Sequence, residues 1–226
     1  MIIKIRNIEF EIIETADQFA EFRDDIEQFW TEYCRKNPEA FSEKILNVLC
    51  IEETEHGIKL QIGIANYYEA FYSKIIGNIK TRNLFSGAYI LTSDGYCCLA
   101  VDTSDEINLI GGVASLKDFD QGRFIPDLCL IRECKEEMGI DITDNHFTYE
   151  PKYLKVTSGN ENYFPVGILY EIKTSYSMNE LEAIFKSNAH DNELSALKFI
   201  RLDDCHEPGI STRRKYIIEL FDLLRG

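Results

Sequence analysis

The chain has 226 residues, a net charge of −15 and a hydrophobic fraction of 45%. That length suits one large domain or a domain with an extension, and that hydrophobic fraction supports a packed core, which excludes wholesale disorder. The acidic surface repels nucleic acid and anionic membranes at long range, so we expect neither as a partner. A small anionic substrate remains compatible with the charge, because bound metal ions can reverse the local field.

The sequence also constrains location and redox state. It has no run of about 18 apolar residues, so no transmembrane helix is expected. Its start lacks the long apolar region of a signal peptide, which makes the cytoplasm the expected location. The seven cysteines are irregularly spaced and form no CxxC pair. They fit neither a disulfide framework nor a zinc cluster, and they predict buried free thiols in a reducing compartment.

The first third of the chain predicts a mixture of strands and helices. An Ile-rich start predicts a short strand or hairpin over Met1–Ile13. A helix is expected from Thr15, with aromatic residues at three- and four-residue spacing that form a core-facing stripe. A second helix is expected over Glu39–Leu49. Clean alternation over Gly57–Ile64 is typical of a half-buried strand.

An aromatic patch, Asn66–Tyr72, follows that strand, with Lys74, Lys80 and Arg82 as the nearest cations. A base or a sugar could stack on these rings, but packing between the two halves of the chain is the favoured interpretation. The composition then turns polar around residues 80–83. We therefore place a boundary there, between an α+β N-terminal extension (residues 1–82) and a second domain (residues 83–226).

Strand signals dominate the second domain. Strands are expected over Leu84–Leu91 and Tyr96–Asp102, joined by a tight Asp-Gly turn. Further strands are expected over Asn108–Ile110, Tyr153–Thr157, Val166–Thr174 and Leu197–Leu202, with helices over Met178–Lys186 and after Ser211, which caps the last one.

Three carboxylates share one side of a helix that ends near Gly139. A helix turns about 100° per residue, so Glu136 and Glu137 lie about 60° and 40° to either side of Glu133. Such like charges repel each other, so a cation is expected to meet them, and hard divalent cations favour carboxylates. The opposite side is apolar and suits a core, and Gly139 ends the helix. A solvated acidic face with ion pairs to neighbouring turns is the alternative interpretation.

The spacing assigns a role to each charged residue of this helix. Glu133 and Glu137, one turn apart, are expected to bind Mg2+ directly, with Mn2+ as an alternative ion. Glu136 is expected to bind a second ion or to act through water. Arg132 lies one turn before Glu136 and is expected to form a salt bridge that orients a carboxylate.

Gly112 together with the segment RECKEEMGI (residues 132–140) resembles the Nudix box, whose second half reads Arg-Glu-apolar-x-Glu-Glu-x-Gly-apolar. The similarity extends from about Leu84 to the C-terminus. It implies an α/β/α sandwich with a mixed sheet, divalent metal on the box helix, and hydrolysis of a nucleoside diphosphate linked to another group. It also implies that the backbone carbonyl near Gly111 or Gly112 supplies a metal ligand.

The first half of the box departs from the family pattern. Gly112 precedes Arg132 by twenty residues, whereas the family places this glycine fourteen before the arginine. The loop from Val113 to Ile125 is therefore expected to contain an insertion of about six residues. Phe124 occupies the position of the first box glutamate. The nearby acids are not in register: Asp118, Asp120 and Asp127.

Other site residues come from outside the box. Glu193 precedes the last strand and is our candidate general base, with Glu161 in reserve. Arg82 and Tyr163 are candidate substrate contacts.

The extension is similar to the N-terminal part of UDP-sugar-hydrolysing Nudix enzymes, which favours a UDP-sugar ahead of ADP-ribose-like or dinucleotide substrates. A non-catalytic Nudix domain that senses a nucleotide is the alternative function. A homodimer formed through the extension is also compatible with the sequence.

Overall fold

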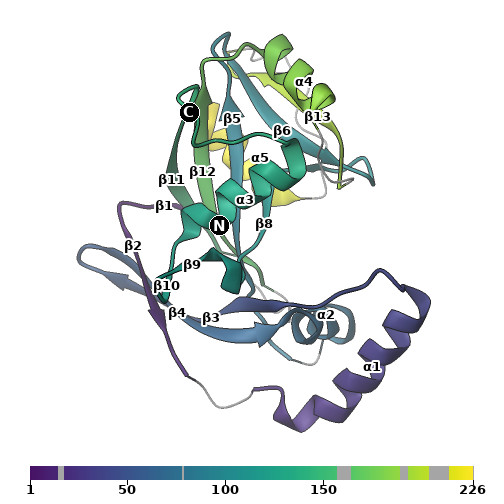
Figure 1. Ribbon diagram of the computed structural model, residues 1–226. Coiled ribbons are helices and arrows are strands. Elements are labelled where there is room, and N and C mark those ends of the chain that lie inside the picture. Colours follow the sequence, from purple (N-terminus) through teal and green to yellow (C-terminus); the bar gives the residue numbers. More distant parts are fainter. Residues whose placement is uncertain (15–17, 78, 157–163, 189–192, 204–213, 226) are drawn as a thin grey trace.

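The computed structural model describes residues 1–14, 18–77, 79–156, 164–188, 193–203 and 214–225. It consists of a body, formed mainly by the residues after 83, and an extension, formed mainly by the residues before them. In Figure 1 the body lies above and the extension lies below.

The body is built on a mixed sheet that has eight strands within the described residues. Its strand β12 pairs in parallel with β5, and the other neighbouring strands pair antiparallel. A central path runs β1-β11-β12-β5-β6-β13, with β7 on β6 and β8 on β5. The bounds are β1 Ile2–Lys4, β5 Leu84–Leu91, β6 Tyr96–Asp102, β7 Ile107–Asn108, β8 Ile110–Val113, β11 Phe147–Lys155, β12 Val166–Thr174 and β13 Leu194–Arg201.

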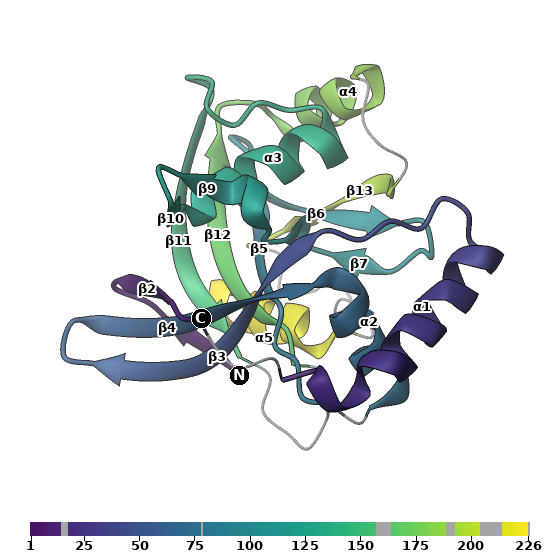
Figure 2. The ribbon, with the colours of Figure 1, turned by 60° about the horizontal axis from the view of Figure 1, so that its bottom comes forward.

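Helices cover both faces of this sheet. The helices α3 (Pro126–Met138) and α4 (Met178–Ser187) bury Leu130 and Leu181 in one core cluster, whereas α5 (Lys215–Arg225) buries Leu220 in a second cluster. Figure 2 shows α3 and α4 above the strands and α5 below them. The expected α/β/α sandwich with a mixed sheet is therefore confirmed.

The extension has its own small sheet, in the order β2-β4-β3, and two helices. Its helices form a separate aromatic-rich core around Ile26 and Tyr72, but its sheet buries Leu46 and Leu60 in the same cluster as α3. The first strand, β1, already lies in the main sheet beside β11. Extension and body therefore share strands and a core. The bounds are β2 Ile8–Ile12, α1 Arg23–Lys36, β3 Lys44–Thr54, β4 Gly57–Asn66 and α2 Tyr67–Ile76.

The prediction of a helix over Glu39–Leu49 is wrong, because strand β3 begins at Lys44. Residues 45–48 are buried on both faces, since one face meets the extension helices and the other meets the main core. A strand that is buried on both faces lacks alternation, and periodicity alone does not separate it from a buried helix.

Several other elements differ from the sequence expectation. Strand β13 begins at Leu194, before the expected Leu197, and the strand expected over Asn108–Ile110 is divided between β7 and β8. Strand β11 begins at Phe147, before the expected Tyr153, and a register shift follows Pro151. The aromatic patch is the start of α2, where Asn66 and Glu69 form a capping box that stabilises the helix. The helix expected from Thr15 begins at Arg23, after a 3-10 turn. The expected caps Thr15, Asp17 and Ser211 lie outside the described residues.

The inserted loop is ordered as a 3-10 turn followed by a small hairpin, β9 (Phe119–Asp120) and β10 (Arg123–Phe124). Phe124 is only 6% exposed, and its ring meets that of Phe10 edge to face at a centroid distance of 5.0 Å. Phe10 belongs to β2 of the extension. The residue that replaces the first box glutamate therefore fastens the extension to the body.

Among the described residues, none of the helices combines the length and the apolar character that crossing a bilayer requires. Cys97, Cys98, Cys129 and Cys134 are buried free thiols, as expected, while Cys34 and Cys50 are half-buried free thiols.

Replacing Phe124 tests whether the insertion holds the extension in place. We expect Phe124→Ala to lower the free energy of unfolding by about 3–5 kcal/mol, because it removes a buried ring and leaves a cavity against Phe10. Denaturant titration measures this. Phe41, which is 73% exposed, is the control, and Phe41→Ala should stay within about 0.5 kcal/mol of the parent. Equal stability of the two variants would contradict this role of Phe124.

Candidate functional site

Helix α3 carries the acidic residues, and its ends are set by local chemistry. Pro126 occupies the first turn, where its missing N–H costs nothing. Gly139 ends the helix with φ of 66°, a left-handed conformation that glycine adopts without strain, as the sequence predicted. The helix buries Leu130, Cys134 and Met138 against the sheet, so its acidic side is fixed toward β8.

Two of the acids contact the two glycines of β8. Glu137 Oε2 accepts a hydrogen bond of 2.7 Å from the backbone N–H of Gly111. At Gly112, an added Cβ would lie 2.4 Å from Oε1 of Glu133, so only glycine allows this carboxylate its position. Gly111 is equally constrained, with φ of +141° and Ser86 O at 2.1 Å from an added Cβ. The Gly-Gly pair therefore lets the helix carboxylates lie directly against the strand.

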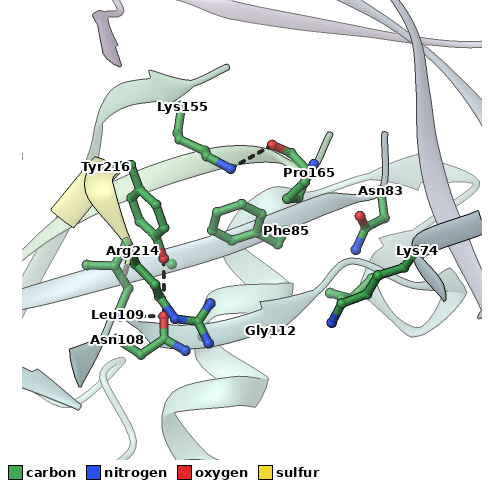
Figure 3. Close-up of a pocket in the computed structure, with 13 residues that line it drawn as sticks. Lys74, Asn83, Phe85, Asn108, Leu109, Gly112, Lys155, Pro165, Arg214 and Tyr216 are labelled. Carbon is green, nitrogen blue, oxygen red and sulfur yellow. Dashed lines mark hydrogen bonds between the residues drawn. The ribbon is translucent and has the colours of Figure 1, made fainter. Parts of the chain in front are cut away.

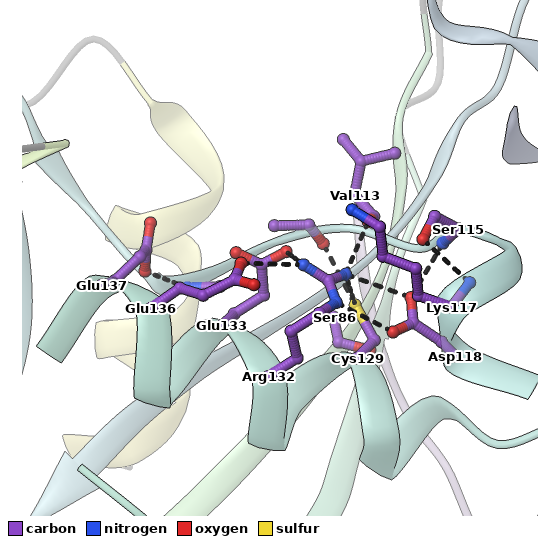
Figure 4. A network of polar contacts seen from close by, with 12 residues as sticks. Ser86, Val113, Ser115, Lys117, Asp118, Cys129, Arg132, Glu133, Glu136 and Glu137 are labelled. Atoms are coloured by element: carbon purple, nitrogen blue, oxygen red, sulfur yellow. Dashed lines mark hydrogen bonds and ion pairs between the residues drawn. The ribbon is translucent and has the colours of Figure 1, made fainter. Parts of the chain in front are cut away.

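Arg132 links the acids to the inserted loop, as Figure 4 shows. Its guanidinium makes two contacts of 3.1 Å with the two carboxylate oxygens of Asp118, which is 1% exposed. It also donates to Glu133 Oε1 at 2.6 Å and to Glu136 Oε2 at 3.2 Å. The expected ion pair with Glu136 is therefore present. Two-pronged pairing fixes the plane of the guanidinium, which in turn orients Glu133.

Asp118 is a site residue that the residue spacing of the box did not predict. It also accepts a hydrogen bond of 2.8 Å from the backbone N–H of Ser115, closing a capping box within the insertion. Its carboxylate comes from the inserted loop, not from a position in register with the box. The only sequence signal was the presence of an acid in that loop.

The three carboxylates differ in burial and electrostatics. The side chain of Glu136 is 51% exposed, whereas Glu133 and Glu137 are 9% and 5% exposed as residues. Burial raises the pKa of Glu133 to about 7, with further increases from the charges of Glu136 and Glu193 and an opposing effect of Arg132. The ionised form of Glu133 is therefore disfavoured at this buried position, in spite of its pairing with Arg132.

The donor set fits a hard divalent cation, although the side chains are not closed around one. Among the described residues, no three Asp, Glu, His or Cys side chains are gathered closely enough to hold a metal ion. Glu133 is turned to Arg132 and Glu137 to Gly111. Still, Glu133, Glu136 and Glu137 offer carboxylate oxygens along one helix face, as Figure 4 shows, and Gly112 lies against the Glu133 carboxylate. Carboxylate oxygens are ligands that Mg2+ favours.

The acidic face opens into a cavity of about 410 Å3, which we call the aromatic cavity. Glu133, Glu136 and Arg132 form one wall, and Glu193 also lines it. Glu193, the candidate general base, is thus at the same cavity as the acidic helix face. The opposite wall comes from the extension, with aromatic residues of α1 and α2: Trp30, Tyr33, Tyr67 and Phe71.

The extension is anchored at this cavity. Lys117 of the insertion forms an ion pair of 2.8 Å with Glu43, and both line the cavity. Tyr67 and Glu193 line the same cavity. Burial raises the pKa of Tyr67, with smaller increases from Tyr33 and from the charge of Glu193. The aromatic patch packs mainly on α1 of the extension, not between the two parts of the chain as expected. It also borders the same cavity as the acidic helix.

Of the two predicted substrate contacts, the structure describes only Arg82. Arg82 is half-buried, its backbone N–H donates to Asn47 Oδ1 at 2.7 Å, and it does not line the aromatic cavity. Tyr163 and Glu161 lie outside the described residues.

Comparison with known proteins identifies the fold. No protein-family model and no curated protein matches the sequence. The structure of Tm1382, named as a candidate Nudix hydrolase, superposes with a TM-score of 0.50 at 14% identity, covering 80% of this chain and 99% of that one. This chain therefore has the Nudix hydrolase fold.

Two weaker likenesses accompany it. A NUDIX-family hydrolase from Clostridium perfringens has a TM-score of 0.43 at 16% identity and covers 63% of this chain and 98% of that one. The Nudix domain of Shewanella oneidensis NrtR, crystallised with ADP-ribose, has a TM-score of 0.43 at 16% identity, covering 67% and 94%.

The Arg132–Asp118 pair is testable by stability. We expect Asp118→Asn to lower the free energy of unfolding by about 3 kcal/mol, because it leaves Arg132 partly uncompensated in a mostly buried place. Asp120 lies two residues away and is exposed, so Asp120→Asn is the matched control and should change stability by less than about 0.5 kcal/mol. Both are measured by urea denaturation at neutral pH. A similar loss in both variants would show that Asp118 has no special role.

Proposed function

We propose that this chain hydrolyses the pyrophosphate bond of a nucleoside diphosphate linked to another group, with Mg2+ or Mn2+ held by α3. One observation carries the proposal. The carboxylates of Glu133 and Glu137 lie against the Gly111–Gly112 backbone, and the same helix face opens into a cavity large enough for a ligand. Ligand cavities commonly measure about 300–1,000 Å3, and the aromatic cavity lies in that range.

In this proposal, Glu133, Glu137 and Glu136 hold the divalent cation, with the Gly112 carbonyl as a further ligand. A bound divalent cation neutralises the charge of the pyrophosphate and lowers the pKa of a water molecule. Arg132 acts indirectly. Its pairing with Asp118 fixes the guanidinium, which positions Glu133 and Glu136 on the cavity wall.

Glu193 is the proposed general base. It lines the same cavity as Glu133 and Glu136, and it is the acid that the sequence suggested for this role. It takes a proton from the attacking water as the water oxygen forms a bond to phosphorus. The bridging phosphorus–oxygen bond breaks, and its electron pair leaves with the departing phosphate. Two phosphate-bearing products result.

The aromatic wall of the extension suits the ring system of such a substrate. Tyr33 and Phe71 lie 4.8 Å apart between ring centroids, and Tyr67 stacks on Phe71 at 6.2 Å. Tyr67 is 38% exposed, so its ring is accessible to a ligand. Bases and sugars pack on such rings, which supports a UDP-sugar or an ADP-ribose-like compound. A panel of nucleotide-sugars, ADP-ribose, diadenosine phosphates and nucleoside triphosphates, scored for released phosphate or monophosphate, identifies the substrate.

Removing one carboxylate charge tests the hydrolase proposal. With the best substrate of that panel and Mg2+, we expect Glu137→Gln to lower kcat about 100-fold or more, because it removes an electrostatic contact that the reaction needs. The parent enzyme should lose its activity in EDTA and regain it with Mg2+ or Mn2+.

Glu182 on α4 is the matched control for this substitution, since it is 43% exposed and paired with Lys186 away from the cavity. Glu182→Gln should keep parental activity. Undiminished turnover by Glu137→Gln would refute the proposal.

The aromatic wall is tested separately. We expect Tyr67→Ala to raise KM about tenfold with little change in kcat, because a stacking contact of about 1–3 kcal/mol binds the ground state and the transition state alike. Tyr96 lies on β6 and contacts Arg201 instead, so Tyr96→Ala is the control. An unchanged KM for Tyr67→Ala would exclude Tyr67 from substrate binding.

A nucleotide sensor with the same fold is the second candidate. The observation in its favour is that Glu133 is paired with Arg132 and that the described acids are not gathered as a metal site. Calorimetry with the same panel separates the two functions. Tight nucleotide binding without any product over hours would support the sensor, and turnover would exclude it.

A further inference from the structure

Phe41 is a largely exposed residue in the lining of the aromatic cavity. It lies between α1 and β3, and it is 73% exposed. A single exposed apolar side chain needs no explanation on most surfaces. Phe41 differs because it shares a cavity with other aromatic residues and with the acidic helix face. A ring left in water at such a place gains free energy when a ligand covers it.

The backbone next to Phe41 is tied to the start of α2. The carbonyl of Glu43 accepts a hydrogen bond of 2.8 Å from the N–H of Tyr67, and Ser42 Oγ accepts one of 3.2 Å from the N–H that follows. The carboxylate of Glu43 also pairs with Lys117 of the inserted loop at 2.8 Å. Phe41 is therefore held close to Tyr67 along the chain, while its own side chain stays exposed.

The accessible rings of Phe41 and Tyr67 border one cavity without filling it. Tyr67 is 38% exposed, and its ring stacks on Phe71 with an interplanar angle of 18°. Within the part of the chain that the structure describes, Phe41 makes no contact with another ring. Tyr67 is thus supported from the side of α2, and Phe41 is available to a ligand in the same cavity.

A second cavity, of about 210 Å3, adjoins the first at Gly112 and is less suited to a ring. The ammonium of Lys155 already faces its two rings, at 5.6 Å from the centroid of Phe85 and 5.1 Å from that of Tyr216. The Tyr216 hydroxyl donates to Asn108 Oδ1 at 3.1 Å, as Figure 3 shows. Protein groups therefore engage the rings of this cavity, which leaves the aromatic cavity as the place for a substrate ring.

We propose that the base of the substrate binds between Phe41 and Tyr67. Base–aromatic stacking accepts any base, because each base has a planar π face. The site therefore selects a molecule that carries a base and tolerates changes of that base. The phosphates then extend toward the acidic helix face, which lines the same cavity. That the ligand is a nucleotide rests on the proposed function, whereas the binding of a planar ring does not.

Nucleoside binding tests this position without metal or turnover. Adenosine and uridine carry a base and a sugar but no phosphate. Trp30, the single tryptophan of the chain, lines the cavity, so its fluorescence reports binding. We expect a saturable fluorescence change with both nucleosides and none with ribose. Phe41→Ala should weaken nucleoside binding about tenfold or more, because it removes one stacking face.

Phe41→Tyr keeps the ring and should bind nucleosides as the parent does. Ile75→Ala is the matched control, since Ile75 is 56% exposed on α2 and does not line the cavity. A parental melting temperature would show that each variant folds. With the best substrate of the panel, Phe41→Ala should raise KM about tenfold and leave kcat nearly unchanged, because stacking binds the ground state and the transition state alike.

Equal nucleoside binding by the parent and Phe41→Ala, or no saturable change up to about 10 mM nucleoside, would overturn the proposal. A change of oligomeric state in Phe41→Ala with unchanged nucleoside binding would assign the ring to a contact between copies of the chain and would also overturn it. Nucleoside binding that depends on Phe41, without any turnover, would refute the hydrolase function and leave the position of the base in place. Turnover with nucleoside binding that does not depend on Phe41 would do the reverse.

Discussion

The close approach of α3 to β8 is the constraint on which the rest of the structure depends. Two carboxylates lie directly against the backbone of Gly111 and Gly112, and any side chain at either glycine would displace them or the strand. Apolar residues on the other side of α3 fix the rotation of the helix, and Arg132 holds two of the acids from the side of the insertion. Burial of like charges is costly, so an arrangement this specific is typical of a functional site.

The inserted loop connects the acidic helix to the extension. The loop supplies Asp118 to Arg132 and Phe124 to the interface with the extension. The extension then brings Tyr67 and Phe71 of α2 to the cavity that the acidic face also lines. The acidic helix alone would be an open surface. With the extension in place, it becomes part of the lining of a cavity that is otherwise largely aromatic.

Local signals predicted much of this arrangement. The bounds of β5, β6 and β12 agree with the sequence, because each has a strong apolar run between turn residues. The α3 helix was predicted from its one-sided apolar face, and its end was predicted from Gly139. Strand β3 was mistaken for a helix because it is buried on both faces and lacks alternation. Sequence patterns report local periodicity, and burial on both faces is decided by tertiary packing.

The site was predicted in part. The acids of α3 and the position of Glu193 followed from spacing and motif. Asp118 was not predicted as a partner of Arg132, because it lies in an insertion with no fixed register. The aromatic patch was evident from the sequence, but its position at the same cavity as the acidic helix was not.

The central claim is that the acidic face of α3 is a platform for a divalent cation. A crystal structure determined with Mn2+, located by its anomalous signal, tests it most directly. The account predicts an ion bound by carboxylate oxygens of Glu133 and Glu137 beside Gly112, with the Glu133–Arg132 contact rearranged. An ion elsewhere, or no ion at saturating Mn2+ with that contact intact, would contradict it.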